Sequence, residues 1–336
     1  MTNLPIHHPV VKTPKVGVLL LNLGTPDATD YWSMRRYLNE FLSDRRVIDY
    51  SPLLWQPLLQ GIILTTRPSR SGHAYEQIWN KDKNESPLKT YTRAQAEKLA
   101  QKLSGIAVSW GMRYGNPSTK AGIDELLEQG CTKILLLALY PQYSACTTAT
   151  AYDKAFSHLK TLRWQPAIRT APPWHDDPAY IDLLAESVRV QFSRTGEAEA
   201  VLCSFHGLPK RYLMQGDPYH CHCVKTSRLV REKLGWSEER WITTFQSRFG
   251  PEEWLQPYTD KTVEAMAEKG VKHLAVISPA FVSECVETLE EINIGLRETF
   301  LEKGGEMFTY IPCLNAEDSH IDFLAGRIKT ELAGWL

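Results

Sequence analysis

Residues 16–22, Val-Gly-Val-Leu-Leu-Leu-Asn, decide the fold class. The run has the length of a strand, and no polar residue interrupts it before Asn22. A strand with one face in water alternates apolar and polar residues, so a continuous run predicts a strand buried on both faces, as in a parallel sheet. Runs of the same type recur at residues 106–112, 133–139, 200–205, 241–245 and 273–278.

Amphipathic stretches lie between these runs. They cover residues 86–103, 121–129, 147–162, 178–192, 221–234, 259–268 and 318–336. Strands that alternate with helices predict an α/β fold with parallel sheets. Because single cores stop growing near ~250–300 residues, a chain of 336 residues is expected to form two domains. We place the first at 15–152, with the helix 318–336 packed back on it, and the second at 153–315.

Charge and composition exclude some functions. The net charge of −1 gives no basic excess that would indicate a nucleic-acid partner. No apolar run approaches the roughly 20 residues that a membrane helix needs. Residues 1–15 are polar and do not resemble a signal peptide, so a cytoplasmic location is expected. The seven cysteines are scattered and odd in number, which favours reduced thiols.

A histidine follows the fourth apolar run directly. His206 precedes Gly207 and Pro209, so its ring is expected at the end of a strand. Ligands of open α/β sheets bind beyond the carboxyl ends of strands, and a neutral imidazole can accept a proton or bind a metal. A lone histidine is, however, more often a structural residue with both ring nitrogens hydrogen-bonded.

Three carboxylates near residue 287 favour a reactive role for His206 over a structural one. Glu287 and Glu291 are four residues apart, and Glu284 lies three residues before Glu287. One interpretation is an acidic helix start stabilised by the helix dipole. The other is an oxygen-lined path for a divalent cation or for protons. A neutral base that faces such a path suits porphyrin metallation, which removes two pyrrole protons and delivers a metal ion.

Seven motifs extend this argument to nearly the whole chain. They are L-L-N-L-G-T-P (20–26), F-L-S-D-R-R-V (41–47), Y-P-Q-Y-S (140–144), S-F-H-G-L-P (204–209), G-D-P-Y (216–219), F-Q-S-R-F-G-P-E-E-W-L-Q-P (245–257) and V-E-T-L-E-E-I (286–292). In this order they resemble the motifs of bacterial ferrochelatases of the Gram-negative type, from about residue 16 to 315. The resemblance implies a lyase that inserts Fe2+ into protoporphyrin IX, the last step of haem biosynthesis.

The resemblance also implies a fold and a site. The expected fold has two Rossmann-like domains with the porphyrin in the cleft between them. His206 is implied as proton acceptor or metal ligand, and Glu287 as its catalytic and metal-binding partner across the macrocycle. Glu284 and Glu291 extend an acidic path, and the helix that carries Glu291 is often locally π-wound in the family. The residues implied to bind the porphyrin are Leu23, Arg67, Arg113, Tyr114, Tyr140 and Trp254.

Some features depart from other branches of the family. Cys285 stands where many relatives have a second histidine, which argues against a metal route through two histidines. Some members carry an iron–sulfur cluster on a cysteine-rich C-terminal extension; the last cysteine here is Cys313, so we expect no cluster and no resident cofactor. Two alternatives stay open, a ferrochelatase for coproporphyrin and a non-catalytic tetrapyrrole carrier. Many bacterial members are monomers, so we expect a monomer.

Two further segments have more than one interpretation. The run His220-Cys221-His222-Cys223 is either a soft-metal site or, as we favour, a helix start with incidental thiols, because adjacent helical residues point in different directions. Residues 41–47 and 51–64 are rich in apolar side chains. They form either the core of a small helical lid or, as in the family, a lip over the cleft with weak peripheral contact to the inner membrane.

Overall fold

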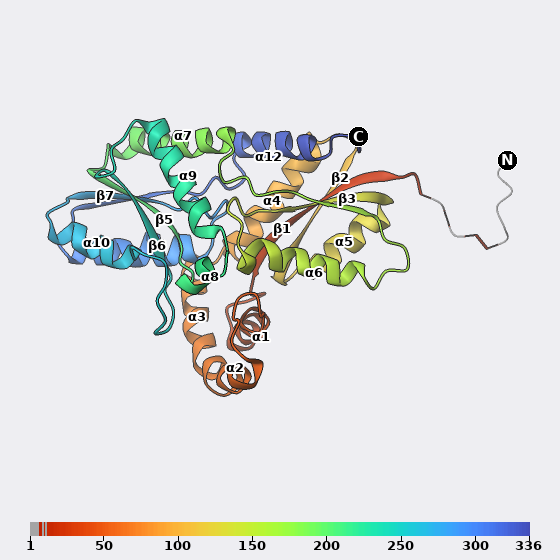
Figure 1. The fold of residues 1–336 in the computed structure, drawn as a ribbon, viewed down its shortest axis with the longest axis horizontal. Helices are drawn as coiled ribbons and strands as arrows, with labels where there is room; N and C mark the ends of the chain where they lie inside the picture. Colours follow the sequence, from red (N-terminus) through yellow and green to blue (C-terminus); the bar gives the residue numbers. More distant parts are fainter. Residues whose placement is uncertain (1–6, 9, 11) are drawn as a thin grey trace.

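The strands of the computed structural model form two parallel sheets of four strands each (Figure 1). The structure describes residues 7, 8, 10 and 12–336, so the expectation about a signal peptide falls largely outside the described residues. The strand order is β2-β1-β3-β4 in one sheet and β6-β5-β7-β8 in the other. The strands are β1 (Lys15–Thr25), β2 (Ile106–Gly115), β3 (Cys131–Ala138), β4 (Ala167–Thr170), β5 (Ala200–His206), β6 (Trp241–Gln246), β7 (His273–Ile277) and β8 (Met307–Ile311).

The burial of β1 confirms the prediction made from its sequence. Val18 and Leu20 belong to one apolar cluster, whereas Leu19 and Leu21 belong to another, and all four side chains are fully buried. Successive side chains of a strand point to opposite faces, so both faces of this sheet are covered. Strand β1 lies between β2 and β3 and pairs with both in parallel register. The α/β fold with parallel sheets is therefore confirmed.

Helices cover the two sheets and join them. They are α4 (Pro87–Lys102), α5 (Thr119–Glu128), α6 (Thr150–Leu159), α7 (Pro178–Thr195), α8 (Lys210–Met214), α9 (Tyr219–Leu234), α10 (Thr259–Glu268), α11 (Arg297–Glu302) and α12 (Asp318–Glu331), with π-helical segments η2 (Ala145–Ala149) and η3 (Glu287–Leu296). Helix α12 packs on α4 and also on α7 (Figure 1). One apolar cluster contains Val18 of the first sheet and Val201 of the second, so the two sheets share a core.

Two short strands were not predicted. β4 pairs with β3, in register from Lys133 and Ala167 onward, and β8 pairs with β7. Because β4 follows residue 152, the first sheet extends beyond the expected boundary between the halves. The division of the chain into two domains stays a prediction.

An arm of three helices projects from the two sheets (Figure 1). It consists of α1 (Tyr31–Leu42), α2 (Pro52–Leu58), the π-helical segment η1 (Leu59–Ile63) and α3 (Leu64–Ile78). Trp55 is buried in a core of the arm and donates a hydrogen bond from Nε1 to the Leu42 carbonyl at 2.7 Å. Leu53 and Leu54 are instead 86% and 77% exposed. The apolar residues of α2 therefore form two groups: Trp55 is buried in the core of the arm, whereas Leu53 and Leu54 lie on its surface.

Within the part of the chain that the structure describes, no helix combines the length and the apolar content that crossing a bilayer requires.

Gly24 offers a direct test of the close approach between β1 and β2. Its φ is +112°, and a Cβ atom at this position would lie 1.8 Å from the Tyr114 carbonyl oxygen. We expect Gly24→Ala to lower the free energy of unfolding by at least ~3 kcal/mol, measured by urea denaturation, because backbone strain adds to a clash that only the backbone can relieve.

Gly105→Ala is the matched control. Gly105 has a φ of +81°, but no atom lies within 4 Å of the added Cβ. Its cost should be limited to strain of about 1–2 kcal/mol. Equal losses in the two variants would contradict the steric role of Gly24.

Candidate active site

His206 lies at the carboxyl end of β5, beside Gln246 of β6. Its Nδ1 is 2.7 Å from the Gly207 carbonyl oxygen. A carbonyl only accepts hydrogen bonds, so Nδ1 carries the hydrogen of the neutral ring and Nε2 keeps the lone pair. The ring of Phe281 meets the His206 ring edge-on at 6.5 Å between centroids. The strand end thus presents a base with a fixed tautomer.

Trp254 forms a wall next to this histidine. A Cβ on Gly207 would lie 3.2 Å from the Trp254 ring, and the backbones of Pro209 and Trp254 form a β-bridge. The indole Nε1 is buried without a hydrogen-bond partner. The same Cβ would lie 2.7 Å from the Gln246 carbonyl oxygen, so a side chain at position 207 would require the backbone to shift.

Gln246 connects the strand of His206 to the acidic helix. The Ser204 hydroxyl donates to Gln246 Oε1 at 2.7 Å, and Gln246 Nε2 donates to the Glu287 carbonyl at 3.1 Å. Ser204 and Gln246 are both buried. The first residue of η3 is therefore fixed against the end of the strand that carries His206, and the structure brings His206 and Glu287 to the same region.

The helix that begins at Glu287 is π-wound, as the family resemblance implied. Glu287 and Glu291 both lie on it, whereas Glu284 precedes the helix and does not share its face. The buried Glu284 carboxylate accepts hydrogen bonds from the Thr288 hydroxyl, the Tyr310 hydroxyl and the Cys313 amide at 2.5, 2.8 and 2.9 Å.

Glu291 lines a cavity of about 250 Å³ behind the helix, together with Ser247 and Asp260. Burial and the neighbouring Glu287 carboxylate raise the pKa of Glu291 to about 8. The Ser247 hydroxyl donates to Glu291 and opposes this rise. At neutral pH the Glu291 side chain is therefore protonated and can donate as well as accept a proton.

Arg67 reaches this acidic region from the arm. Burial lowers its pKa, and the Glu291 carboxylate opposes that change. Its guanidinium lies 5.2 Å from the centroid of the Phe249 ring. Arg67 thus links the arm to the loop that follows β6.

Tyrosines of the first sheet and the arm face Glu287. Burial raises the pKa of Tyr75 and Tyr37, and the Glu287 carboxylate adds to both shifts. The Tyr140 hydroxyl is buried without a hydrogen-bond partner. Burial likewise raises the pKa of the Cys285 thiol, and Glu287 adds to it. These hydroxyls and the thiol therefore stay protonated near neutral pH.

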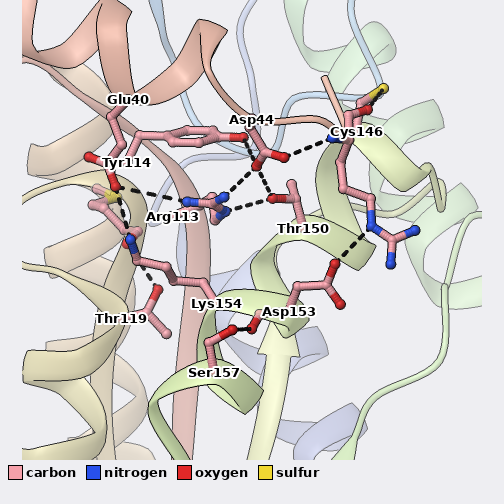
Figure 2. A network of polar contacts seen from close by, with 12 residues as sticks. Glu40, Asp44, Arg113, Tyr114, Thr119, Cys146, Thr150, Asp153, Lys154 and Ser157 are labelled. Carbon is pink, nitrogen blue, oxygen red and sulfur yellow. Dashed lines mark hydrogen bonds and ion pairs between the residues drawn. The ribbon is translucent and has the colours of Figure 1, made fainter. Parts of the chain in front are cut away.

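Arg113 and Tyr114 lie in a polar network with Asp44 (Figure 2). Tyr114 is fully buried and donates to Asp44 Oδ2 at 2.8 Å, and Arg113 forms an ion pair with the same carboxylate. Leu23 packs against the core of the arm. The structure therefore places these three predicted residues in the junction between arm and sheet, with their polar groups already bonded.

The side chains of residues 220–223 point in different directions. His222 stacks on His175 at 3.7 Å between centroids, and His220 stacks on Phe245 at 5.6 Å. Cys223 is buried, whereas Cys221 is exposed. This arrangement favours the interpretation as a helix start. Among the described residues, no group of three or more His, Cys, Asp or Glu side chains is placed to hold a metal ion.

Comparison with known proteins identifies the class first. The sirohydrochlorin chelatase SirB from Bacillus subtilis subspecies spizizenii, solved with cobalt, shares this architecture with a TM-score of 0.55. The match covers 94% of this chain and 95% of that one at 11% identity, so it establishes the fold alone. Two parallel sheets joined in this way are thus a chelatase fold.

The family follows from closer relatives. The ferrochelatase family model matches residues 15–332. A ferrochelatase from Agrobacterium fabrum is 58% identical over 100% of this chain and 99% of its own length. One from Rhizobium meliloti is 58% identical over 98% of both chains. The chain belongs to the ferrochelatase family, whose members are lyases that insert iron into a porphyrin.

Sequence reasoning missed several residues of this site. Gln246, Ser247 and Asp44 lie inside quoted motifs, yet nothing in their spacing indicated which group each would contact. Tyr37 and Tyr75 lie outside those motifs. Their positions depend on how the arm packs, which the strand and helix patterns do not determine.

The raised pKa of Glu291 can be tested through its neighbour. In Glu287→Gln we expect the pKa of Glu291 to fall from about 8, because a like charge that disfavours ionisation is removed. Infrared titration of the carboxylate bands measures this value. Glu290→Gln should produce a smaller decrease, and an unchanged pKa in Glu287→Gln would contradict the proximity of the two carboxylates.

Proposed function

We propose that this protein inserts Fe2+ into protoporphyrin IX and releases two protons and protohaem. The observation that carries the proposal is the link from Ser204 through Gln246 to Glu287, which holds a base and a carboxylate helix side by side. Full-length relatives named ferrochelatase support it. Protoporphyrin IX and Fe2+ are substrates, and no resident cofactor or iron–sulfur cluster is part of the proposal.

His206 accepts pyrrole protons in this mechanism. Its Nε2 lone pair is available because Nδ1 is bound to the Gly207 carbonyl. Glu287, which Gln246 holds near the strand end that carries His206, stabilises the incoming cation. Trp254 supplies an aromatic wall for the ring, and the Arg67 cation is suited to a propionate.

Glu291 continues the acidic path from Glu287 toward the cavity behind the helix. A carboxyl group with a pKa of about 8 exchanges protons readily near neutral pH, so Glu291 can pass released protons to solvent. Leu23, Arg113, Tyr114 and Tyr140 complete the wall on the side of the first sheet.

Anaerobic metallation tests this function. Purified protein given Fe2+ and protoporphyrin IX should produce the haem spectrum. In His206→Ala, turnover should fall by roughly 100-fold or more, because general-base catalysis contributes about 10²–10⁴. Porphyrin binding, measured by fluorescence, should be retained.

The same assay separates the alternatives. Faster turnover of coproporphyrin than of protoporphyrin IX would favour the coproporphyrin enzyme. If the wild type binds porphyrin but gives no haem above the non-enzymatic rate, the result would favour a non-catalytic tetrapyrrole carrier.

We also propose that the protein acts as a cytoplasmic monomer whose arm makes weak contact with the inner membrane. Leu53, Leu54 and Ile62 are 86%, 77% and 60% exposed on the arm. The exposed Arg70 of α3 adds positive charge. Apolar side chains with nearby cations favour the surface of anionic lipid bilayers.

Vesicle sedimentation tests this contact. With vesicles of phosphatidylglycerol and phosphatidylcholine, Leu53→Ser/Leu54→Ser should lower the bound fraction severalfold, since each buried leucine is worth roughly 2 kcal/mol. Leu301→Ser on α11 removes an exposed leucine away from the arm and should bind as the wild type does. Equal loss in both variants would show that the arm is not the contact.

A further inference from the structure

Asp44 lies where the arm meets the first sheet (Figure 2). Its Oδ2 accepts a hydrogen bond from the Tyr114 hydroxyl at 2.8 Å, and Oδ1 accepts one from the Arg46 amide at 2.8 Å. The Thr150 hydroxyl and the Arg113 guanidinium also donate to Oδ2. Four donors thus converge on one carboxylate, whose side chain is only 7% exposed.

Arg113 is held on several sides by this network. Its Nε donates to the Thr150 hydroxyl at 2.6 Å, and its guanidinium lies 4.3 Å from the centroid of the Tyr114 ring. The side chain is 13% exposed. Removing one partner of a buried ion pair leaves an uncompensated charge, which is far more disruptive than losing an exposed pair.

This cation lies within electrostatic reach of the active site. Burial raises the pKa of the Tyr140 hydroxyl, Arg113 opposes the rise, and Glu287 adds to it. The Tyr114 ring, which lies 4.3 Å from the Arg113 guanidinium, belongs to an apolar cluster against which Val286, the residue before Glu287, packs. Any divalent cation near Glu287 also experiences the field of Arg113.

The network is electrically neutral in total. Arg113 and Lys154 supply two positive charges, and Asp44 and Glu40 supply two negative ones. Lys154 Nζ lies 3.1 Å from Glu40 Oε1, and Glu40 Oε1 lies 3.9 Å from Arg113 Nη1. Without Asp44, a net positive charge would remain where the arm meets the first sheet.

We propose that Asp44 is a positioning residue for metal insertion, which neutralises and fixes Arg113 so that the cleft wall opposite Glu287 does not repel the incoming Fe2+. The inference rests on the proposed function, because it assigns the metal ion to the space near Glu287. Charges in a protein interior are poorly screened, so one uncompensated guanidinium acts over many ångströms on a divalent ion.

The test measures anaerobic metallation kinetics with Fe2+ and protoporphyrin IX. Asp44→Asn keeps the shape of the side chain and removes its charge. We expect the KM for Fe2+ to rise about tenfold or more while kcat changes less than about threefold.

A second substitution separates charge from structure. In Asp44→Asn/Arg113→Met the unpaired cation is gone, so the KM for Fe2+ should return toward the value of Arg113→Met alone. Such a rescue would show that the unpaired charge of Arg113, and not the lost hydrogen bonds of Asp44, raises the KM for Fe2+. Failure of this rescue would overturn the proposal.

Asp153→Asn is the matched control. It removes the same charge from α6, but Asp153 is 50% exposed and pairs with Arg46 at 2.8 Å on the surface. Its KM for Fe2+ should stay at the wild-type value, because exposed pairs are screened.

The remaining outcomes are also decisive. If Asp44→Asn does not fold, as judged by circular dichroism, Glu40→Gln carries the test, with an expected rise in KM of about threefold because Glu40 is more exposed. An unchanged KM in a folded variant overturns the role of Asp44. A wild type without turnover overturns the proposed function itself, and this is seen before any variant is assayed.

Discussion

The site depends on the hydrogen bonds of one buried amide. Gln246 accepts from Ser204 on its own sheet and donates to the carbonyl of Glu287, the first residue of the π-helical segment. Because His206 and Gln246 are neighbours in the parallel ladder, this amide also sets where the acidic helix begins relative to the histidine. A side chain without both a donor and an acceptor could not make this link. The geometry of this candidate site is thus built from strand register rather than from loops.

The surroundings of this link raise the pKa values of nearby acidic groups. Burial and the neighbouring Glu287 carboxylate raise the pKa of Glu291 to about 8, so the Glu291 carboxyl group is largely protonated near neutral pH. The tyrosines that face Glu287 are also kept protonated by burial. In the proposed mechanism the second sheet supplies the base and the proton path, whereas the first sheet and the arm supply hydrogen-bond donors and a compensated cation.

Much of this could be predicted from the sequence, and the exceptions have physical causes. The long buried strands were predicted because continuous apolar runs are needed wherever helices cover both faces of a sheet. Strand β4 was missed because it is short and carries Arg169, whose charge is accommodated by contacts that no local pattern reveals: its guanidinium lies 4.4 Å from the Trp335 ring centroid. A small helical lid was expected at residues 41–47 and 51–64, but the bounds of α1, α2 and α3 were not predicted, because Pro57 and Pro68 lie inside α2 and α3. His206 and Glu287 were proposed from local patterns and motifs, whereas the contacts of Gln246 and Asp44 are with partners distant in sequence.

The core shared by the two sheets has a mechanical consequence. Trp174 packs edge-on against Tyr180 at 4.9 Å and against Phe323 of α12 at 5.3 Å, and Tyr180 donates to the Pro279 carbonyl at 2.5 Å. Such a joint resists hinge bending, since close-packed interiors are nearly incompressible. The shared core therefore keeps the ends of the two sheets at a fixed separation, so a substrate bound at these ends meets a spacing that the fold has already set.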